Sequence, residues 1–249
     1  MGEDNPHLLH WQYLIDGLLT YTRIYTMTDK AEYIKRLEKL DACAVSDALD
    51  AVGSPGAHSG IPRRSTNARI AGVVQTVKLS DQEPKGGSKR HLGTAAIDSA
   101  DELTVIVVEQ RTGIDCAGWG GVLANAAKAR GVRGVIMEGP ARDIDEYEEI
   151  GFPVFSRTTT PHTARGRVWE QSFGEPVQVG DSEVLPGDFV IADGSGVVFI
   201  PAGKAQEVIA KAERIAEKER LMTADVLQGK PVSEVMGTNY ENMLDKNND

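Results

Sequence analysis

Hydrophobic and polar positions follow two kinds of pattern along the chain, and together they predict an α/β protein. Helical patterns predict helices over residues 31–40, 44–52, 92–100, 122–130 and 202–222, with a short acidic helix that ends at residue 150. Alternating or continuous apolar runs predict strands over residues 68–77, 103–108, 134–137, 153–155, 176–179, 189–192 and 197–200.

The central part of the chain has the order strand, glycine-rich loop, helix, strand. The run from Thr104 to Val108 is apolar after its first residue, which is typical of a strand buried on both faces. A loop rich in glycine occupies residues 112–121, the helix over 122–130 follows, and a second buried strand begins at Gly134. This order predicts a βαβ unit.

One domain over residues 27–225 accounts for most of these elements. We interpret residues 1–26 as an upstream extension, although 10–19 could form a short amphipathic helix, and residues 226–249 as a polar tail. Deletion of the extension is expected to leave activity and assembly intact. A shortened protein that fails to fold would contradict this interpretation.

Composition narrows the range of functions. The net charge of −10 removes the attraction to phosphate backbones that drives non-specific nucleic-acid binding, so nucleic acid is not an expected partner. Only two cysteines are present, Cys43 and Cys116, without CxxC spacing or a secretory signal, which favours a cytoplasmic protein. No apolar run approaches the roughly 20 residues of a membrane span.

The loop before the helix at Val122 is a candidate anion site. Glycines at 118, 120 and 121 leave the amides of a helix N-terminus open to a carboxylate or phosphate. The loop matches neither the Walker pattern nor the GxGxxG dinucleotide fingerprint. An ordinary tight turn that lets helix and strand pack explains the same glycines equally well.

Arg142 and Asp143 follow the second strand of the βαβ unit, at the carboxyl end where ligands of α/β sheets bind. The guanidinium can bind a carboxylate with two hydrogen bonds, and the carboxylate is a hard oxygen ligand for Mg²⁺ or Mn²⁺. A lone pair of this kind is more often a surface salt bridge. The anion site at the end of the preceding strand favours a site for a metal-chelated 2-oxo acid.

Other polar residues are weaker candidates. His91 could carry a proton, and so could His162, but a lone histidine is more often a packing or capping residue. Most of the acids at 145, 146, 148 and 149 are expected on a solvated helix face, although Asp145 or Glu146 could reach a metal through water. Neither cysteine has an identifiable activating base.

With these residues in view, the chain resembles the family of the regulator of ribonuclease activity A (RraA) and the 4-hydroxy-4-methyl-2-oxoglutarate/4-carboxy-4-hydroxy-2-oxoadipate aldolases. The resemblance extends from about Lys39 to Met222. Its motifs are Ala44-Val45-Ser46-Asp47-Ala48-Leu49-Asp50, Trp119-Gly120-Gly121, Gly139-Pro140-Ala141-Arg142-Asp143, Gly151-Phe152-Pro153-Val154-Phe155, Pro186-Gly187-Asp188 and Asp193-Gly194-Ser195-Gly196-Val197.

This resemblance implies a swivelling β/β/α domain with mixed sheets, flanking helices and a long C-terminal helix, assembled as a homotrimer or homohexamer with sites between subunits. It implies that Arg142 binds substrate and that Asp143 holds Mg²⁺ or Mn²⁺, largely through water. The pyruvate carboxylate would be bound by the backbone amides of Gly120, Gly121, Val122 and Leu123. Glu217 or Glu219 of a neighbouring subunit would complete the metal site.

One departure from the family pattern affects the expected reaction. The resemblance places an acidic residue twenty-one positions before the arginine in the aldolases, and this chain has Gly121 there. Retro-aldol cleavage needs a base for the C4 hydroxyl proton, whereas decarboxylation needs only the electron sink that a metal provides. The departure therefore favours oxaloacetate decarboxylation or a variant lyase over a standard aldolase.

Three functional hypotheses follow. The first is a metal-dependent carbon–carbon lyase, a class II-type aldolase or oxaloacetate decarboxylase that releases pyruvate, with His91 or a water moving the proton. The second is a non-catalytic RraA-type regulator that binds a ribonuclease. The third is a different lyase or hydrolase that uses the same metal site in a catabolic pathway.

Overall fold

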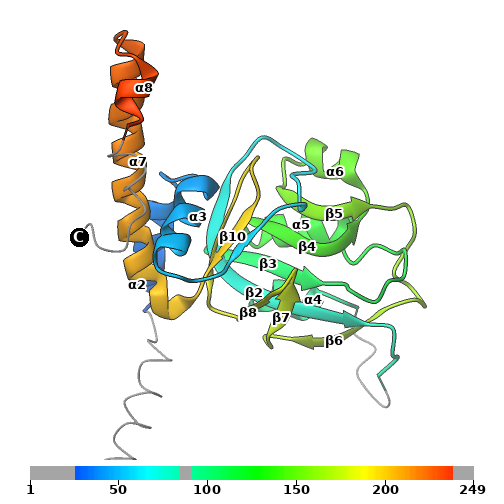
Figure 1. Cartoon of the computed structure of the whole chain (residues 1–249). Coiled ribbons are helices and arrows are strands. Elements are labelled where there is room, and N and C mark those ends of the chain that lie inside the picture. The colour runs from blue at the N-terminus through cyan, green and yellow to red at the C-terminus, as the bar shows by residue number, and fades with distance from the viewer. Residues whose placement is uncertain (1–25, 85–90, 238–249) are drawn as a thin grey trace, which may run out of the picture.

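One mixed sheet organises the molecule, which we describe from a computed structural model covering residues 26–84 and 91–237 (Figure 1). The strands are β1 (Ala57–His58), β2 (Ile70–Ser80), β3 (Thr104–Glu109), β4 (Gly134–Ala141), β5 (Val154–Thr159), β6 (Trp169–Phe173), β7 (Val177–Val179), β8 (Ser182–Val184), β9 (Phe189–Ala192) and β10 (Val197–Ile200). The helices are α2 (Met27–Leu37), α3 (Ala42–Ala51), α4 (Thr94–Ser99), α5 (Gly121–Ala129), α6 (Ile144–Glu149), the 3₁₀ turn η1 (Ala202–Lys204), α7 (Ala205–Leu227) and α8 (Val232–Val235).

The main sheet has the strand order β1-β10-β9-β2-β3-β4-β5, and β6 pairs with the far end of β2. Strands β2, β3, β4 and β5 are parallel to one another, whereas β1, β10, β9 and β6 form antiparallel pairs, β9 and β6 both with β2. The hairpin of β7 and β8 forms a separate small sheet. The predicted α/β class with mixed sheets and flanking helices is confirmed.

Hydrophobic cores cover both faces of the parallel strands. In β3, Ile106 and Val108 pack with α4, α5 and α6 on one face, while Val105 and Val107 pack against residues of the β7–β8 hairpin on the other. Alternation of side chains across a strand sends successive residues to opposite faces, so a run buried on both faces must be apolar throughout. The expected βαβ unit is therefore present as β3, α5 and β4.

A third core joins the N- and C-terminal parts of the chain. Helices α2, α3 and α7 pack together against β9 and β10, at the other end of the sheet from α5 and α6 (Figure 1). Asp41 caps α3, because its side chain accepts a hydrogen bond from the amide of Ala44 at 2.8 Å. Thr26 and Asp29 form a capping box at the start of α2.

Several elements differ from the predicted ones. The strand after Gly134 continues to Ala141, and the C-terminal helix continues to Leu227, with α8 following in the segment expected to be a polar tail. Strands β1, β6 and β8 were not predicted, since their partly exposed residues give no clear alternation. The proposed extension falls almost wholly outside the described residues. No helix in the described ranges is long and apolar enough to cross a membrane.

Candidate functional site

A pocket lies at the carboxyl ends of β3 and β4, where the sequence predicts a ligand site. Four segments line it: the residues just before α4, the loop into α5 with that helix's first turn, the residues that follow β4, and the loop after β5. The lining residues are His91, Leu92, Ala117, Gly118, Trp119, Gly120, Gly121, Val122, Leu123, Arg142, Asp143, Thr163, Ala164 and Arg165.

Backbone hydrogen bonds fasten the glycine loop to the end of β4. The amide of Gly118 donates to the carbonyl of Pro140 at 3.0 Å, and the amide of Arg142 donates to the carbonyl of Trp119 at 3.1 Å. Trp119 forms a parallel bridge with Ala141. The two predicted halves of the site are therefore adjacent in space, and their relative position is set by the backbone.

Asp143 occupies the centre of this arrangement in an unusual backbone conformation. Its φ of 61° and ψ of 42° lie in the left-handed region, which is costly for a residue other than glycine and is common at functional sites. Its Oδ2 accepts hydrogen bonds from the amide of Gly121 at 2.8 Å and from Nε of Arg142 at 3.2 Å. Within the described part of the chain, Oδ1 accepts no hydrogen bond and is available to a ligand.

Of the amides expected to bind a carboxylate, one is therefore already used inside the protein and others are open. Gly121 donates to Asp143, whereas Val122 and Leu123 belong to the first helical turn, whose amides have no intrahelical acceptor. Gly120 precedes them as the N-cap residue in an extended conformation. A Cβ atom on Gly120 would lie 2.9 Å from Oδ2 of Asp143, so this approach requires glycine.

His91 lines the pocket and is exposed. Its Nδ1 lies 3.0 Å from the carbonyl oxygen of Leu92, and because a carbonyl can only accept, Nδ1 carries the proton. Nε2 of the neutral ring is then an acceptor, as a proton carrier requires. The preceding loop from Lys85 to Arg90 lies outside the described residues.

The two acids expected from the C-terminal helix do not join this pocket within one chain. Glu217 and Glu219 lie on α7, which packs beside β9 and β10, at the other end of the sheet from α5 and α6 (Figure 1). Glu217 pairs with Arg220 at 2.7 Å, and burial raises the pKa of Glu219. A role for either residue would require a second subunit, and that role stays a prediction.

The loop after β5 contributes pocket residues that the sequence alone did not indicate. Thr163, Ala164 and Arg165 line the pocket, and Arg165 is exposed. Strand β5 is parallel to β4, so the loops after β3, β4 and β5 all reach the same edge of the sheet. Recognition of 153–155 as the next parallel strand could have drawn attention to this arginine.

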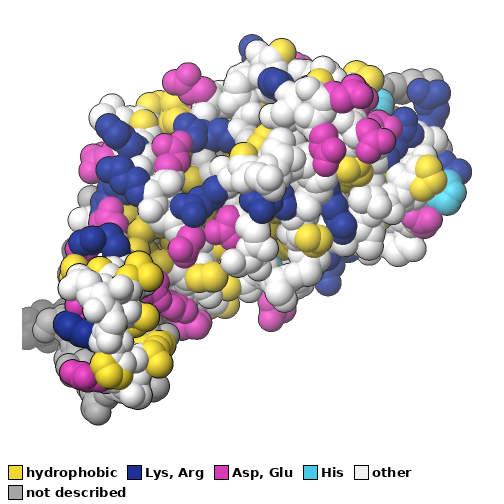
Figure 2. Space-filling model, turned by 90° about the horizontal axis from the view of Figure 1, so that it is seen from above, with side chains coloured by type: hydrophobic (Ala, Val, Ile, Leu, Met, Phe, Trp, Pro, Cys, Tyr) yellow, Lys and Arg dark blue, Asp and Glu magenta, His cyan; other side chains and the backbone are white. Residues whose placement is uncertain are grey.

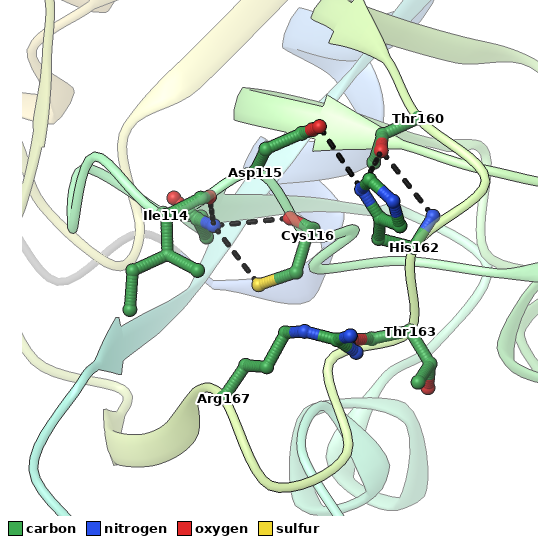
Figure 3. Close-up of polar contacts among 8 residues, drawn as sticks. Ile114, Asp115, Cys116, Thr160, His162, Thr163 and Arg167 are labelled. Carbon is green, nitrogen blue, oxygen red and sulfur yellow. Dashed lines mark hydrogen bonds and ion pairs between the residues drawn. The ribbon is translucent and has the colours of Figure 1, made fainter.

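His162 helps to hold that loop in place (Figure 3). Its carbonyl accepts from the amide of Ala117 at 3.0 Å, and its Nδ1 lies 3.0 Å from Oδ2 of Asp115. Hydrogen bonds from Thr160 and from His162 lower the pKa of Asp115. His162 does not line the pocket, and these contacts assign it a structural role.

Cys116 is also structural. It is buried, its carbonyl and Sγ receive hydrogen bonds from Nε2 of Gln110, and burial raises the pKa of its thiol (Figure 3). A thiol held protonated is a poor nucleophile. The cysteine side chain therefore offers no covalent chemistry at this site.

The donor set fits a cation that keeps most of its water. Asp143 is the one carboxylate among the described pocket residues, and no cluster of three His, Cys, Asp or Glu side chains occurs within residues 26–84 and 91–237. Mg²⁺ typically binds through one or two carboxylates and retains several waters, so Asp143 is an adequate anchor for it. A dehydrated zinc-type site would need more protein ligands.

A guanidinium and helix amides at adjoining parallel strand ends are groups that can bind a small anion in an α/β protein. A family model for RraA-like proteins, described as Aldolase/RraA, matches residues 42–199. The chain therefore belongs to the RraA-like family.

Known proteins that are similar to this chain differ from one another in length and description. Protein DlpA of Legionella pneumophila is 31% identical over 77% of this chain, which spans only 31% of DlpA. A putative 4-hydroxy-4-methyl-2-oxoglutarate aldolase of Halalkalibacterium halodurans is 27% identical over 74% of this chain and 83% of its own length. The structure of Streptomyces coelicolor RraAS2, described as an unusual member of the RNase ES inhibitor RraA family, superposes with a TM-score of 0.68 at 26% identity, covering 76% of this chain and 97% of RraAS2.

Proposed function

We propose that this protein is a divalent-metal-dependent lyase that cleaves a carbon–carbon bond of a small 2-oxo acid and releases pyruvate. The observation that carries the proposal is the position of Asp143, whose carboxylate meets the Gly121 amide and the Arg142 guanidinium inside one pocket. Relatives named as aldolases support the reaction class.

Each pocket group has a role that its chemistry suits. Asp143 would hold Mg²⁺ or Mn²⁺, which supplies Lewis-acid polarisation of the 2-oxo group when bound. Arg142 would orient the substrate and stabilise the negative charge that develops on its oxo oxygen. The amides of Val122 and Leu123 would bind the 1-carboxylate at the start of α5.

A second cationic side chain favours a dicarboxylic substrate. Arg165 enters the pocket from the loop after β5, separate from Arg142 after β4. Oxaloacetate and 4-hydroxy-4-methyl-2-oxoglutarate both carry a distal carboxylate, and a guanidinium is well suited to bind it. His91, with Nε2 as an acceptor, would move a proton to or from the substrate carbon.

The direct test is pyruvate release from oxaloacetate and from 4-hydroxy-4-methyl-2-oxoglutarate, with Mg²⁺, Mn²⁺ or a chelator. Asp143→Asn is the appropriate variant because asparagine tolerates the left-handed conformation and still accepts from Gly121, while it removes the charge. We expect turnover to fall about a hundredfold or more, as for loss of a main transition-state contact. Equal and negligible turnover by wild type and variant on both substrates would reject the proposal.

A non-catalytic regulator remains the second candidate because RraAS2 is described as a relative of an RNase ES inhibitor. The Asp143→Asn variant separates the two functions. A regulator would inhibit a ribonuclease of that type equally well with either residue at 143, and would release no pyruvate.

A further inference from the structure

The carboxylate of Glu146 occupies the space that a side chain at position 121 would fill. A Cβ atom on Gly121 would lie 1.8 Å from Oε2 and 2.3 Å from Cδ of Glu146. Real atoms do not approach so closely, so the carboxylate rests directly on the Cα of Gly121. Glycine at this position allows α6 to deliver a carboxylate to the start of α5.

Asn125 holds the carboxylate there. Its Nδ2 donates to Oε1 of Glu146 at 2.7 Å and to the carbonyl of Gly121 at 3.0 Å. The amide of Gly121 donates to Asp143, so two carboxylates from α6 and its N-cap converge on one glycine. Because N and Cα of a residue are about 1.5 Å apart, the nearest oxygens of these carboxylates lie within about 8 Å of each other.

The charges around this pair are unbalanced. Arg142 contacts Asp143, whereas the hydrogen bond of Glu146 within the described ranges comes from neutral Asn125. The hydroxyl of Tyr147, fully buried on the same helix, has no hydrogen-bond partner among the described residues. A cation with its water shell would balance the charge and offer the hydroxyl an acceptor.

We propose that Glu146 is the second carboxylate of this cation site and acts from α6 in place of a side chain at Gly121. The inference rests on the proposed metal-dependent function. With Asp143 it would hold the water shell of the divalent cation, and Asn125 would position it. Glycine at 121 is thus matched to Glu146 and does not mark the loss of an acidic group from the site.

Mn²⁺ binding to the full chain, measured by electron paramagnetic resonance and calorimetry without substrate, tests the inference. Glu146→Gln and Gly121→Ala should each weaken Mn²⁺ binding about ten- to hundredfold, the usual effect of losing a group that supports a metal ligand. The backbone of Gly121 is not left-handed and the obstructing atoms end a flexible side chain, so alanine should displace Glu146 without unfolding the protein. Glu149→Gln, an exposed acid on the same helix, is the matched control and should bind Mn²⁺ normally.

A reciprocal exchange gives the sharpest result. Gly121→Asp alone should weaken Mn²⁺ binding, because the new carboxylate collides with Glu146, whereas Gly121→Asp combined with Glu146→Ala should restore it to within about threefold of wild type. Normal binding by Glu146→Gln together with loss of binding in Asp143→Asn would overturn this inference and leave the proposed function standing. Absence of Mn²⁺ binding by wild type would overturn both.

Discussion

At the scale of single residues, Asp143 best illustrates how local structure serves the site. A left-handed backbone conformation costs an aspartate on the order of 1 kcal/mol or more, and the hydrogen bond from Gly121 helps to hold it. This conformation turns the carboxylate towards the first turn of α5. Helix capping does not account for this conformation, since the side chain makes no cap bond to α6, whereas the proposed role in holding a cation does.

Arg165 gives a residue-scale prediction about substrate choice. Arg165→Gln should raise KM for oxaloacetate about tenfold and change kcat little, because it removes one exposed, charge-assisted hydrogen bond to the distal carboxylate. Steady-state kinetics with Mg²⁺ would measure this. Arg167→Gln, whose guanidinium binds the carbonyl of Thr163 in the same loop, is the control. A similar rise in KM for both variants would mean that loop structure, and not charge at 165, determines binding.

The sequence predicted the main chemical groups but not their contacts. The positions of Arg142 and Asp143 followed from the βαβ order, since parallel strand ends meet at one edge. The hydrogen bond from Gly121 to Asp143 and the contact of Glu146 with Gly121 depend on how α6 turns back against α5, which no local pattern encodes. The sequence showed Gly121 at the position where the family resemblance implies an acidic residue, but it did not show that Glu146 packs against this glycine.

At the scale of elements, the buried strands and capped helices were predictable because each has a strong local signal. The strands over 189–192 and 197–200 have the predicted bounds, and Asp41 caps α3. Short edge strands such as β6 were missed because their pairing is set by the end of β2, a distant segment of the chain. Such contacts form only when the whole sheet is assembled.

An ion pair between α2 and α7 gives an element-scale prediction about pH. Nε and Nη2 of Arg36 donate to the carboxylate of Glu213 at 2.8 Å each, and this hydrogen bonding lowers the pKa of Glu213. A carboxyl whose pKa is lowered by folding stabilises the protein above its unfolded pKa, and the contribution is lost as the pH falls through its folded pKa. Because the pair is partly exposed, we expect at most about 1 kcal/mol.

Glu213→Gln should therefore lower the Tm by about 2–4 °C at pH 7, and the difference from wild type should shrink as the pH is lowered from about 5 towards 2. Thermal unfolding followed by circular dichroism would measure it, with Glu149→Gln as the control. A difference that stays constant across this range would show that the charge of Glu213 makes no contribution.

At the scale of the whole molecule, apolar side chains are exposed at the end of α7 and on α8. Leu221, Leu227 and Val232 are 52%, 82% and 58% exposed, and hydrophobic side chains are visible on this projecting end (Figure 2). Apolar groups gathered on a projecting helix are typical of association surfaces. They support the predicted homotrimer or homohexamer and would allow Glu217 or Glu219 to approach a neighbouring site.

Leu227→Gln combined with Val232→Gln should shift the protein towards monomers, because both apolar contacts would be lost. Size-exclusion chromatography with light scattering would measure the change, and Ser233→Ala is the control. Pyruvate release should fall together with assembly if a neighbouring subunit completes the site. Full activity in a monomeric variant would restrict the site to one chain.

In the proposed function, a divalent cation and a 2-oxo acid bind together at Asp143. A crystal structure with Mn²⁺ and oxalate, a mimic of the enolate of pyruvate, tests it most directly, because anomalous scattering locates the metal independently of the protein. We predict a manganese peak beside Asp143, with oxalate in contact with Arg142 and the amides at the start of α5. Manganese or oxalate bound only elsewhere would contradict it.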